Sequence, residues 1–295
     1  MRAFQQPTQQ ALLPTLVSRD VLPRALALNS AGSQLANIVG PAIAGFAYAA
    51  GAIVVYGACM GMSVFSITMF SAIRVKSQRS GREPLTLQSL FAGINFIWHR
   101  KEVLGAISLD LFAVLFGGST VLLPIFAREV LHAASWGLGL LRAAPAVGAL
   151  LMSLYLAQNP IQRRVGRTMF GAVALYGLAT LIFAFSQSLF VSIGALMLSG
   201  AFDMVSVVVR QTLIQMQTPN DMRGRVSAVN SIFIGASNQL GEFESGMTAG
   251  RFGAVPSVLM GGTATILIVA LWIRLFPTLA RADEVSGGVT ARPGA

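Results

Sequence analysis

The sequence predicts an all-α protein that crosses a lipid bilayer several times. Of its 295 residues, 54% are hydrophobic and only 11% are charged, whereas a soluble globular chain carries roughly 25% charged residues. The apolar residues gather in eight runs of about twenty, the length at which a helix crosses roughly 30 Å of hydrocarbon. The basic residues fall between these runs, mostly in every second connection. These three observations favour a polytopic membrane protein over a water-soluble fold.

Eight full transmembrane helices are expected, one for each apolar run. They cover approximately Ala25 to Tyr48, Gly51 to Ile73, Leu104 to Ala127, Trp136 to Ala157, Thr168 to Ser186, Leu189 to Gln211, Ser227 to Ala249 and Val255 to Phe276. The segment Ala3 to Val17 is shorter and contains Pro7, Pro14 and four glutamines, so it cannot span alone. We interpret it as the end of a helix whose beginning is missing.

Loop charge predicts the orientation, because Lys and Arg in short loops stay on the cytoplasmic side. The chain has 21 Lys and Arg against 11 Asp and Glu, a net charge of +10. Only Arg128 with Glu129, and Arg251, fall in the alternate connections, so the pattern predicts a cytoplasmic C-terminus. The basic residues form short clusters and no soluble face with interleaved aromatic residues, which argues against a nucleic acid as partner. The clusters are Arg19 and Arg24; Arg74, Lys76, Arg79, Arg82, Arg100 and Lys101; Arg163, Arg164 and Arg167; Arg223 and Arg225; and Arg274, Arg281 and Arg292.

The longest connection, Arg74 to Val103, contains a second kind of helix signal. After a basic stretch with Gly and Ser, apolar residues recur at a spacing that places them on one helical face. This pattern favours an amphipathic helix lying on the cytoplasmic leaflet. A cytoplasmic extension of the next spanning helix is the alternative. The residues of this face are Leu87, Leu90, Phe91, Ile94, Ile97 and Trp98.

Cysteine and histidine are too rare for the chemistry that they often carry. Cys59 is the only cysteine, and His99 and His132 are the only histidines. We therefore expect no metal site, no cofactor and no enzymatic constellation of nucleophile and base.

An internal repeat appears at an offset of 201 residues (230 − 29), which places Asn29-Ser30 on Asn230-Ser231. At the same offset Asp20 meets Asp221 and Arg24 meets Arg225. Parallel repeats of two helix bundles are the architecture of one large class of transporters.

These residues also carry a resemblance to a known family. The chain resembles the major facilitator superfamily, and within it the group that contains the enterobactin exporter and the transmembrane secretion effectors. The resemblance rests on the following segments: Gln9-Gln10-Ala11-Leu12-Leu13-Pro14, Leu26-x-x-Asn29-Ser30 with Gly40-Pro41, Arg210 to Gln215, Thr218-Pro219-x-Asp221-x-Arg223-Gly224-Arg225, and Gly235 to Glu242.

The resemblance implies twelve helices in two six-helix halves. On that plan the eight runs are helices five to twelve, Ala3 to Val17 is the end of helix four, and the first three helices are absent, so that the chain is N-terminally truncated. We therefore expect four regions: a remnant of the N-terminal bundle (1–73), a cytoplasmic linker with the amphipathic helix (74–103), the C-terminal bundle (104–278) and a disordered cytoplasmic tail (279–295).

Charged residues inside the expected spans are candidates for function, because an ionisable group in hydrocarbon costs several kcal/mol unless it faces a cavity or a partner. Asp203 lies mid-helix without a local counter-charge, which makes it the best candidate for a proton-carrying or substrate-contacting carboxylate. Arg142 is a further candidate for the substrate or proton pathway, and a salt bridge between Asp203 and Arg142 is the structural alternative. Asp110 sits near the cytoplasmic end of its helix, so pathway and edge positions are both open. Glu242 and Glu244 point about 200° apart on a helix, so one of them can line the cavity.

A second group of charges is expected at the cytoplasmic helix ends, where the resemblance implies networks that hold one access state closed. Arg163, Arg164 and Arg167 resemble the basic inter-helix motif of the second half, although its upstream Gly and Asp are not found at 157–160. The remaining members of the expected network are Arg210, Asp221, Arg223 and Arg225, with Asp20 and Arg24 as their counterparts in the first half.

The resemblance implies an antiporter in the bacterial cytoplasmic membrane that exports a siderophore or a drug-like amphiphile. Proton coupling rests on Asp203. Two alternatives stay open: a transport-inactive remnant or a membrane subunit that needs the missing helices, and the membrane domain of an ATP-driven permease.

Overall fold

The computed structural model describes Gly32, Leu35 and Ala36 and residues 52–72, 87–133, 135–159, 161, 164–219 and 222–280. Most of the span expected from Ala25 to Tyr48 lies outside these residues, as do the segment Ala3 to Val17 and the tail from 281 onward. The predicted division into four regions therefore stays a prediction.

Within the described residues all regular structure is helical. The long helices are α3 (Ala52–Ala72), α5 (Lys101–Gly117), α7 (Ser135–Gln158), α8 (Val165–Phe185), α9 (Leu189–Gln217), α10 (Arg223–Phe252) and α11 (Ala254–Leu275). The short elements are α4 (Leu87–His99), the 3-10 turn η1 (Ser119–Leu122), α6 (Leu123–Ile125), the π-turn η2 (Phe126–Val130) and α12 (Pro277–Ala280).

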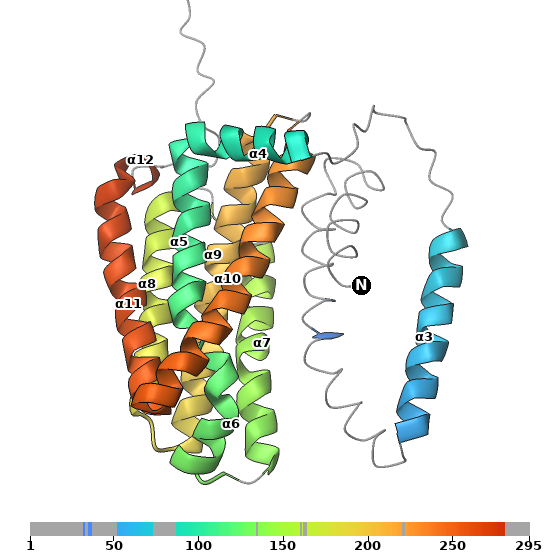
Figure 1. Ribbon diagram of the computed structural model, residues 1–295, viewed down its shortest axis with the longest axis vertical. Helices are drawn as coiled ribbons and strands as arrows, with labels where there is room; N and C mark the ends of the chain where they lie inside the picture. The colour runs from blue at the N-terminus through green and yellow to red at the C-terminus, as the bar shows by residue number, and fades with distance from the viewer. Residues whose placement is uncertain are drawn as a thin grey trace, which may run out of the picture.

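Helices α5 and α7 to α11 form one bundle (Figure 1). Helix α9 packs against α7 and α8, α11 packs against α8 and α5, and α10 packs against α5. Most of the buried side chains are apolar, although buried serines, threonines and a few charged groups lie among them. The largest apolar cluster is built around Leu109, Met169, Leu213 and Trp272. Such close packing explains why the helices associate, since hydrophobic burial alone gives little gain between helices in lipid.

Five helical segments are long and apolar enough to cross a membrane, which confirms the all-α membrane class; the expected number of eight spans stays a prediction. They are Lys101–Val130, Trp136–Gln158, Val165–Phe185, Leu189–Gln217 and Ala254–Leu275. In α3 the apolar part is shorter, Ile53–Met69. Helix α10 has the length of a span but is not among the five, because polar residues such as Asn238, Gln239 and Glu242 interrupt its apolar sequence.

The first span of the bundle is not one continuous α-helix. Helix α5 ends at Gly117, Gly118 leaves helical geometry with φ −67° and ψ 50°, and η1, α6 and η2 continue the crossing. Irregular backbone at membrane depth is tolerated where protein buries it. Here the break lies against α10: a methyl group on Gly241 would come within 2.9 Å of the carbonyl oxygens of Val114 and Leu115.

Helix α4 is separate from α5 and lies across the ends of the upright helices (Figure 1). The chain turns at Arg100, where φ is −102° and ψ is 90°. One side of α4 packs on α10, because Gly93 lets the backbones approach: a methyl group there would lie 3.1 Å from the carbonyl oxygen of Arg225. The sequence 87–99 is therefore a helix of its own and no extension of α5.

The crossing of α7 and α9 depends on two glycines. A methyl group on Gly200 would lie 1.9 Å from the carbonyl oxygen of Pro145, and one on Gly148 would lie 1.8 Å from that of Met197. Both contacts are with backbone, which cannot rotate away. Small residues at such crossings allow the close helix approach that holds membrane bundles together.

We predict that Gly200→Ala destabilises the bundle, because α7 and α9 must separate to admit the methyl group. Overpacking of this kind costs about 1–3 kcal/mol, so thermal unfolding of the detergent-solubilised protein should begin at a lower temperature. Gly194→Ala on the same helix is the matched control, since a methyl group there meets nothing within 4 Å. Equal unfolding temperatures of the two variants would show that the crossing is looser than described.

Candidate functional site

Helices α5, α8 and α9 bring charged and polar side chains together inside the bundle. Asp203, Ser206 and Arg210 lie three and seven residues apart along α9, so a helix turns them to one side. Helix α5 contributes Asp110, and α8 contributes Tyr176. The site is therefore built on rigid helices, with only the break after Gly117 nearby.

Asp110 and Arg210 form a buried ion pair, in which Nη1 of Arg210 donates to Oδ2 of Asp110. The two residues are only 4% and 3% exposed. A second guanidinium nitrogen, Nε of Arg210, makes no hydrogen bond within the described residues. Burial of both charges in a low-dielectric interior makes each dependent on the other, since an unpaired buried charge is costly.

Asp203 lies beside this pair without a basic partner of its own: the described residues contain no salt bridge to its carboxylate. With Asp110 neutralised by Arg210, an ionised Asp203 gives the site a net charge of −1, and a protonated Asp203 makes it neutral. Asp203 is thus the carboxylate in the site whose charge is not balanced.

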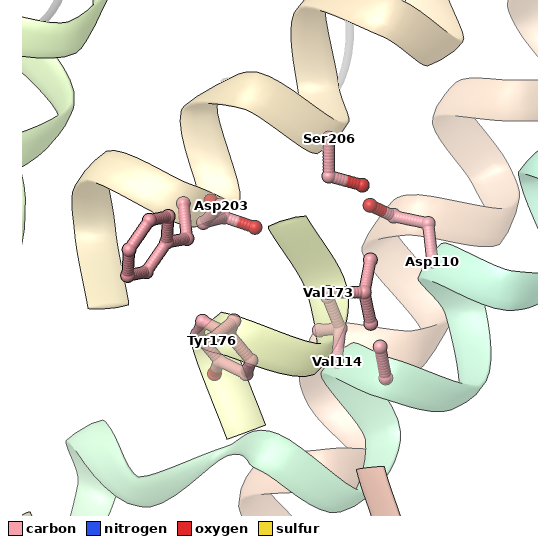
Figure 2. Close-up of a pocket in the computed structure, with 8 residues that line it drawn as sticks. Asp110, Val114, Val173, Tyr176, Asp203 and Ser206 are labelled. Carbon is pink, nitrogen blue, oxygen red and sulfur yellow. The ribbon is translucent and has the colours of Figure 1, made fainter. Parts of the chain in front are cut away.

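A cavity of about 10 Å³ separates the carboxylates, which is room for roughly one water molecule. Figure 2 shows Asp203 on one side of it and Asp110 with Ser206 on the other, over Val173 and Val114. The complete lining is Asp110, Ala113, Val114, Val173, Tyr176, Phe202, Asp203 and Ser206. The cavity is too small for a transported compound but large enough for a water molecule that connects two carboxylates.

Tyr176 links this cavity to the break in the first span. Its hydroxyl donates to the carbonyl oxygen of Gly117 at 2.8 Å. Gly117 is the last residue of α5. A side chain on Gly117 would collide with the ring, because a methyl group there would lie 2.6 Å from it. Tyr176 therefore satisfies a carbonyl group at the break while its ring lines the carboxylate cavity.

This geometry corrects two expected contacts and decides between the two positions left open for Asp110. Arg142 does not pair with Asp203: it lies exposed on α7. Arg210 does not join a helix-end network, because α9 continues to Gln217 and places Arg210 two turns inside the helix, paired with Asp110. Asp110 is likewise no edge residue, since it is buried in the middle of α5.

Other charges expected at the helix ends are found there or lie outside the described residues. Nε of Arg223 donates to the carbonyl oxygen of Thr218, and a nitrogen of Arg225 contacts the sulfur of Met222 at 3.6 Å. Arg164 and Arg167 are exposed at the start of α8. The structure does not describe Asp20, Arg24, Arg163 or Asp221.

Glu242 and Glu244 occupy different sides of α10, as expected from their spacing. Glu242 is exposed and Glu244 is partly buried. Asn238 and Gln239 are exposed one turn before Glu242, so a polar stripe runs along the open side of this helix. Among the described residues no group of three or more His, Cys, Asp or Glu lies close enough to hold a metal ion.

Two polar contacts near the same end of the bundle were not expected from the sequence. Nε2 of Gln217 at the end of α9 donates to Glu102 at the start of α5. The indole nitrogen of Trp272 on α11 donates to the hydroxyl of Ser108 at 3.0 Å. Both contacts join residues more than 100 positions apart. In the sequence each of these residues is only a polar group in or beside an apolar run, which does not reveal its partner.

Ionisable residues inside a bundle of spanning helices often mark a path for ions or substrates, so the buried ion pair and the unbalanced carboxylate indicate a transporter. Comparison with known families agrees, because the profile of the transmembrane secretion effectors, a family of the major facilitator superfamily (MFS), matches residues 2–288. The chain belongs to this family. It is therefore a multi-pass membrane transporter.

Its relatives are bacterial transporters. The chain is similar to the enterobactin exporter EntS of Escherichia coli O157:H7, with 27% identity over 290 residues, which covers 96% of this chain and 68% of the exporter. It is also similar to the MFS-type transporter YjbB of Bacillus subtilis, with 26% identity over 284 residues, 93% of this chain and 67% of that protein. The enterobactin exporter of Shigella boydii is 27% identical over 287 residues, 95% of this chain and 68% of the exporter.

Proposed function

We propose that the protein exports a siderophore or a drug-like amphiphile by alternating access, driven by protons that enter in exchange. The observation that carries the proposal is the unbalanced carboxylate of Asp203 beside the buried Asp110–Arg210 pair. The choice of substrate class is supported by the similarity to the enterobactin exporters of Escherichia coli and Shigella boydii.

Asp203 has the properties that a proton carrier needs. Its two protonation states differ by a full charge in a buried site, so its proton affinity changes strongly when water reaches the cavity from one side. The Asp110–Arg210 pair has no net charge, so the charge of the site depends on Asp203 alone. The cavity has room for about one water molecule, which can relay the proton. In the proposed cycle a bound substrate lowers the proton affinity of Asp203, and a proton on Asp203 weakens substrate binding by the same factor.

We propose that the polar stripe on α10 lines one side of the substrate path. Asn238, Gln239 and Glu242 are exposed on a helix of spanning length, and a charged side chain facing lipid at the bilayer centre costs about 2.5–3.5 kcal/mol. This cost favours a position towards a water-filled path. Arg142, exposed on α7, is proposed to line the same path.

The proposed orientation places α4 and the start of α5 at the cytoplasmic side of a bacterial inner membrane, and so places the C-terminus there too. At this end of the bundle lie the exposed cations Arg100, Lys101, Arg164, Arg223 and Arg274, and basic residues concentrate at the cytoplasmic side. The helix-end arginines, with Asp20, Arg24, Arg163 and Asp221, are proposed to hold one access state closed.

The proposal is tested by transport into vesicles made from purified protein. The probes are enterobactin and ethidium, a permanent cation whose charge does not change with pH. With the vesicle interior made acidic, both probes should accumulate inside, because outward proton flow drives them inward. A protonophore should abolish this accumulation. Equal uptake with and without the pH gradient would contradict proton coupling. Binding of the probes without any uptake would favour the alternative that the protein is inactive in transport.

A further inference from the structure

Helix α4 carries a second apolar surface that the described part of the protein does not cover. Phe91, Ile94 and Trp98 are three and four residues apart, so they share one side of the helix. Phe91 is 66% and Trp98 is 69% exposed. Large uncovered apolar groups of this kind mark interaction sites for protein or membrane.

The contacts of the other sides of α4 determine the direction in which this apolar surface faces. Ile97 is 3% exposed and packs in a cluster with Val226 and Val229 at the start of α10. At 100° per residue, the uncovered apolar side lies about a third of a turn from this packed side. Asn95 and His99, which are exposed, lie beyond it, opposite the packed side. The helix thus has a packed base, an apolar flank and a polar top.

The surroundings of α4 are strongly basic. Arg100 and Lys101 follow the helix directly and are exposed, and the guanidinium of Arg100 lies 5.8 Å from the centre of the Phe96 ring. Helices α8, α10 and α11 begin or end at the same level (Figure 1), where they add the exposed Arg164, Arg167, Arg223 and Arg274. A positive surface beside an apolar flank matches acidic lipid headgroups above acyl chains.

We propose that α4 binds the surface of the cytoplasmic leaflet, with Phe91, Ile94 and Trp98 inserted between the acyl chains and with Arg100 and Lys101 on acidic phospholipid headgroups. The helix lies at the level where the spanning helices end, which is where the bilayer interface must be. Aromatic side chains are favoured at that depth. Because α4 packs on the start of α10, this attachment also fixes that end of α10 to the membrane surface.

Fluorescence of Trp98 tests the proposal in the whole protein. Trp98 is made the only tryptophan by Trp136→Phe and Trp272→Phe, and the protein is placed in vesicles of phosphatidylcholine and phosphatidylglycerol. Bromine on the acyl chains of either lipid quenches a tryptophan that touches it. We expect quenching by both, and stronger quenching by brominated phosphatidylglycerol. Arg100→Gln and Lys101→Gln should each lower this preference by about fivefold, the equivalent of the ~1 kcal/mol that one surface cation contributes.

Two isoleucines of α4 give the matched control. Ile94→Ser should reduce the quenching of Trp98 and leave the thermal unfolding temperature unchanged, whereas Ile97→Ser should lower the unfolding temperature, because Ile97 is buried against α10. No quenching of Trp98 by either lipid, or equal destabilisation by both substitutions, would show that another part of the protein covers the flank. Equal quenching by the two lipids would overturn the role of acidic headgroups.

Discussion

Asp203→Asn is expected to reduce the accumulation of both probes against their gradients. The protein should still fold, and it should bind the probes with the lower affinity of the protonated form, because asparagine is neutral. Asparagine has nearly the shape of aspartate and fits the same cavity, but it carries no exchangeable charge. Without a titrating group at this position, the proton gradient cannot shift the equilibrium between the two access states. Coupling free energies between two ligands are typically 1–3 kcal/mol, or about 5- to 150-fold. We therefore expect gradient-driven uptake to fall by a factor in this range.

The measurement compares uptake with and without a pH gradient for wild type and variant in the same vesicles. Exchange of labelled for unlabelled ethidium, which needs no net proton movement, should persist in the variant. Glu129→Gln is the matched control, because Glu129 is an exposed acid at the opposite end of the first span. Wild-type sensitivity to the pH gradient in Asp203→Asn would remove the support for proton coupling.

Breaking the Asp110–Arg210 pair is expected to give the largest loss of stability. Removing one partner of a buried pair leaves the other charge uncompensated, which costs about 3–5 kcal/mol. Asp110→Asn and Arg210→Gln should therefore each lower the unfolding temperature substantially. The double variant should recover a large part of the loss, because it buries no charge.

Thermal unfolding of the three variants in one detergent forms a double-mutant cycle that isolates the pair energy. Arg142→Gln is the control for loss of an arginine, since Arg142 is exposed and has no salt bridge within the described residues. It should unfold as the wild type does. Additive losses in the double variant would indicate that the two groups do not depend on each other.

The spanning helices follow from the sequence because the hydrocarbon thickness fixes their length. The run expected from Trp136 to Ala157 is helix Ser135–Gln158, and the run from Val255 to Phe276 is Ala254–Leu275. Helix α9 shows where this reasoning ends. Its apolar run stops near Gln211, but the helix continues to Gln217. This extension is why Arg210 lies inside the helix.

Only part of the candidate site can be predicted from the sequence. Asp203 stands out, because a carboxylate in an apolar run has no local partner. The pairing of Asp110 with Arg210 joins residues 100 positions apart and depends on how α5 packs beside α9. Tyr176 gives no signal either, since a tyrosine in an apolar run is an ordinary packing residue. Its role appears only when Gly117 is found at a helix break.

The most direct test of the account is the proton content of the purified protein when ethidium binds. If substrate and proton compete for the same state, ethidium binding must release protons, and low pH must weaken ethidium binding by the same factor. A pH indicator dye in weakly buffered detergent solution measures the release. We expect proton release from the wild type and none from Asp203→Asn. Ethidium binding to the wild type without proton release at any pH would contradict it.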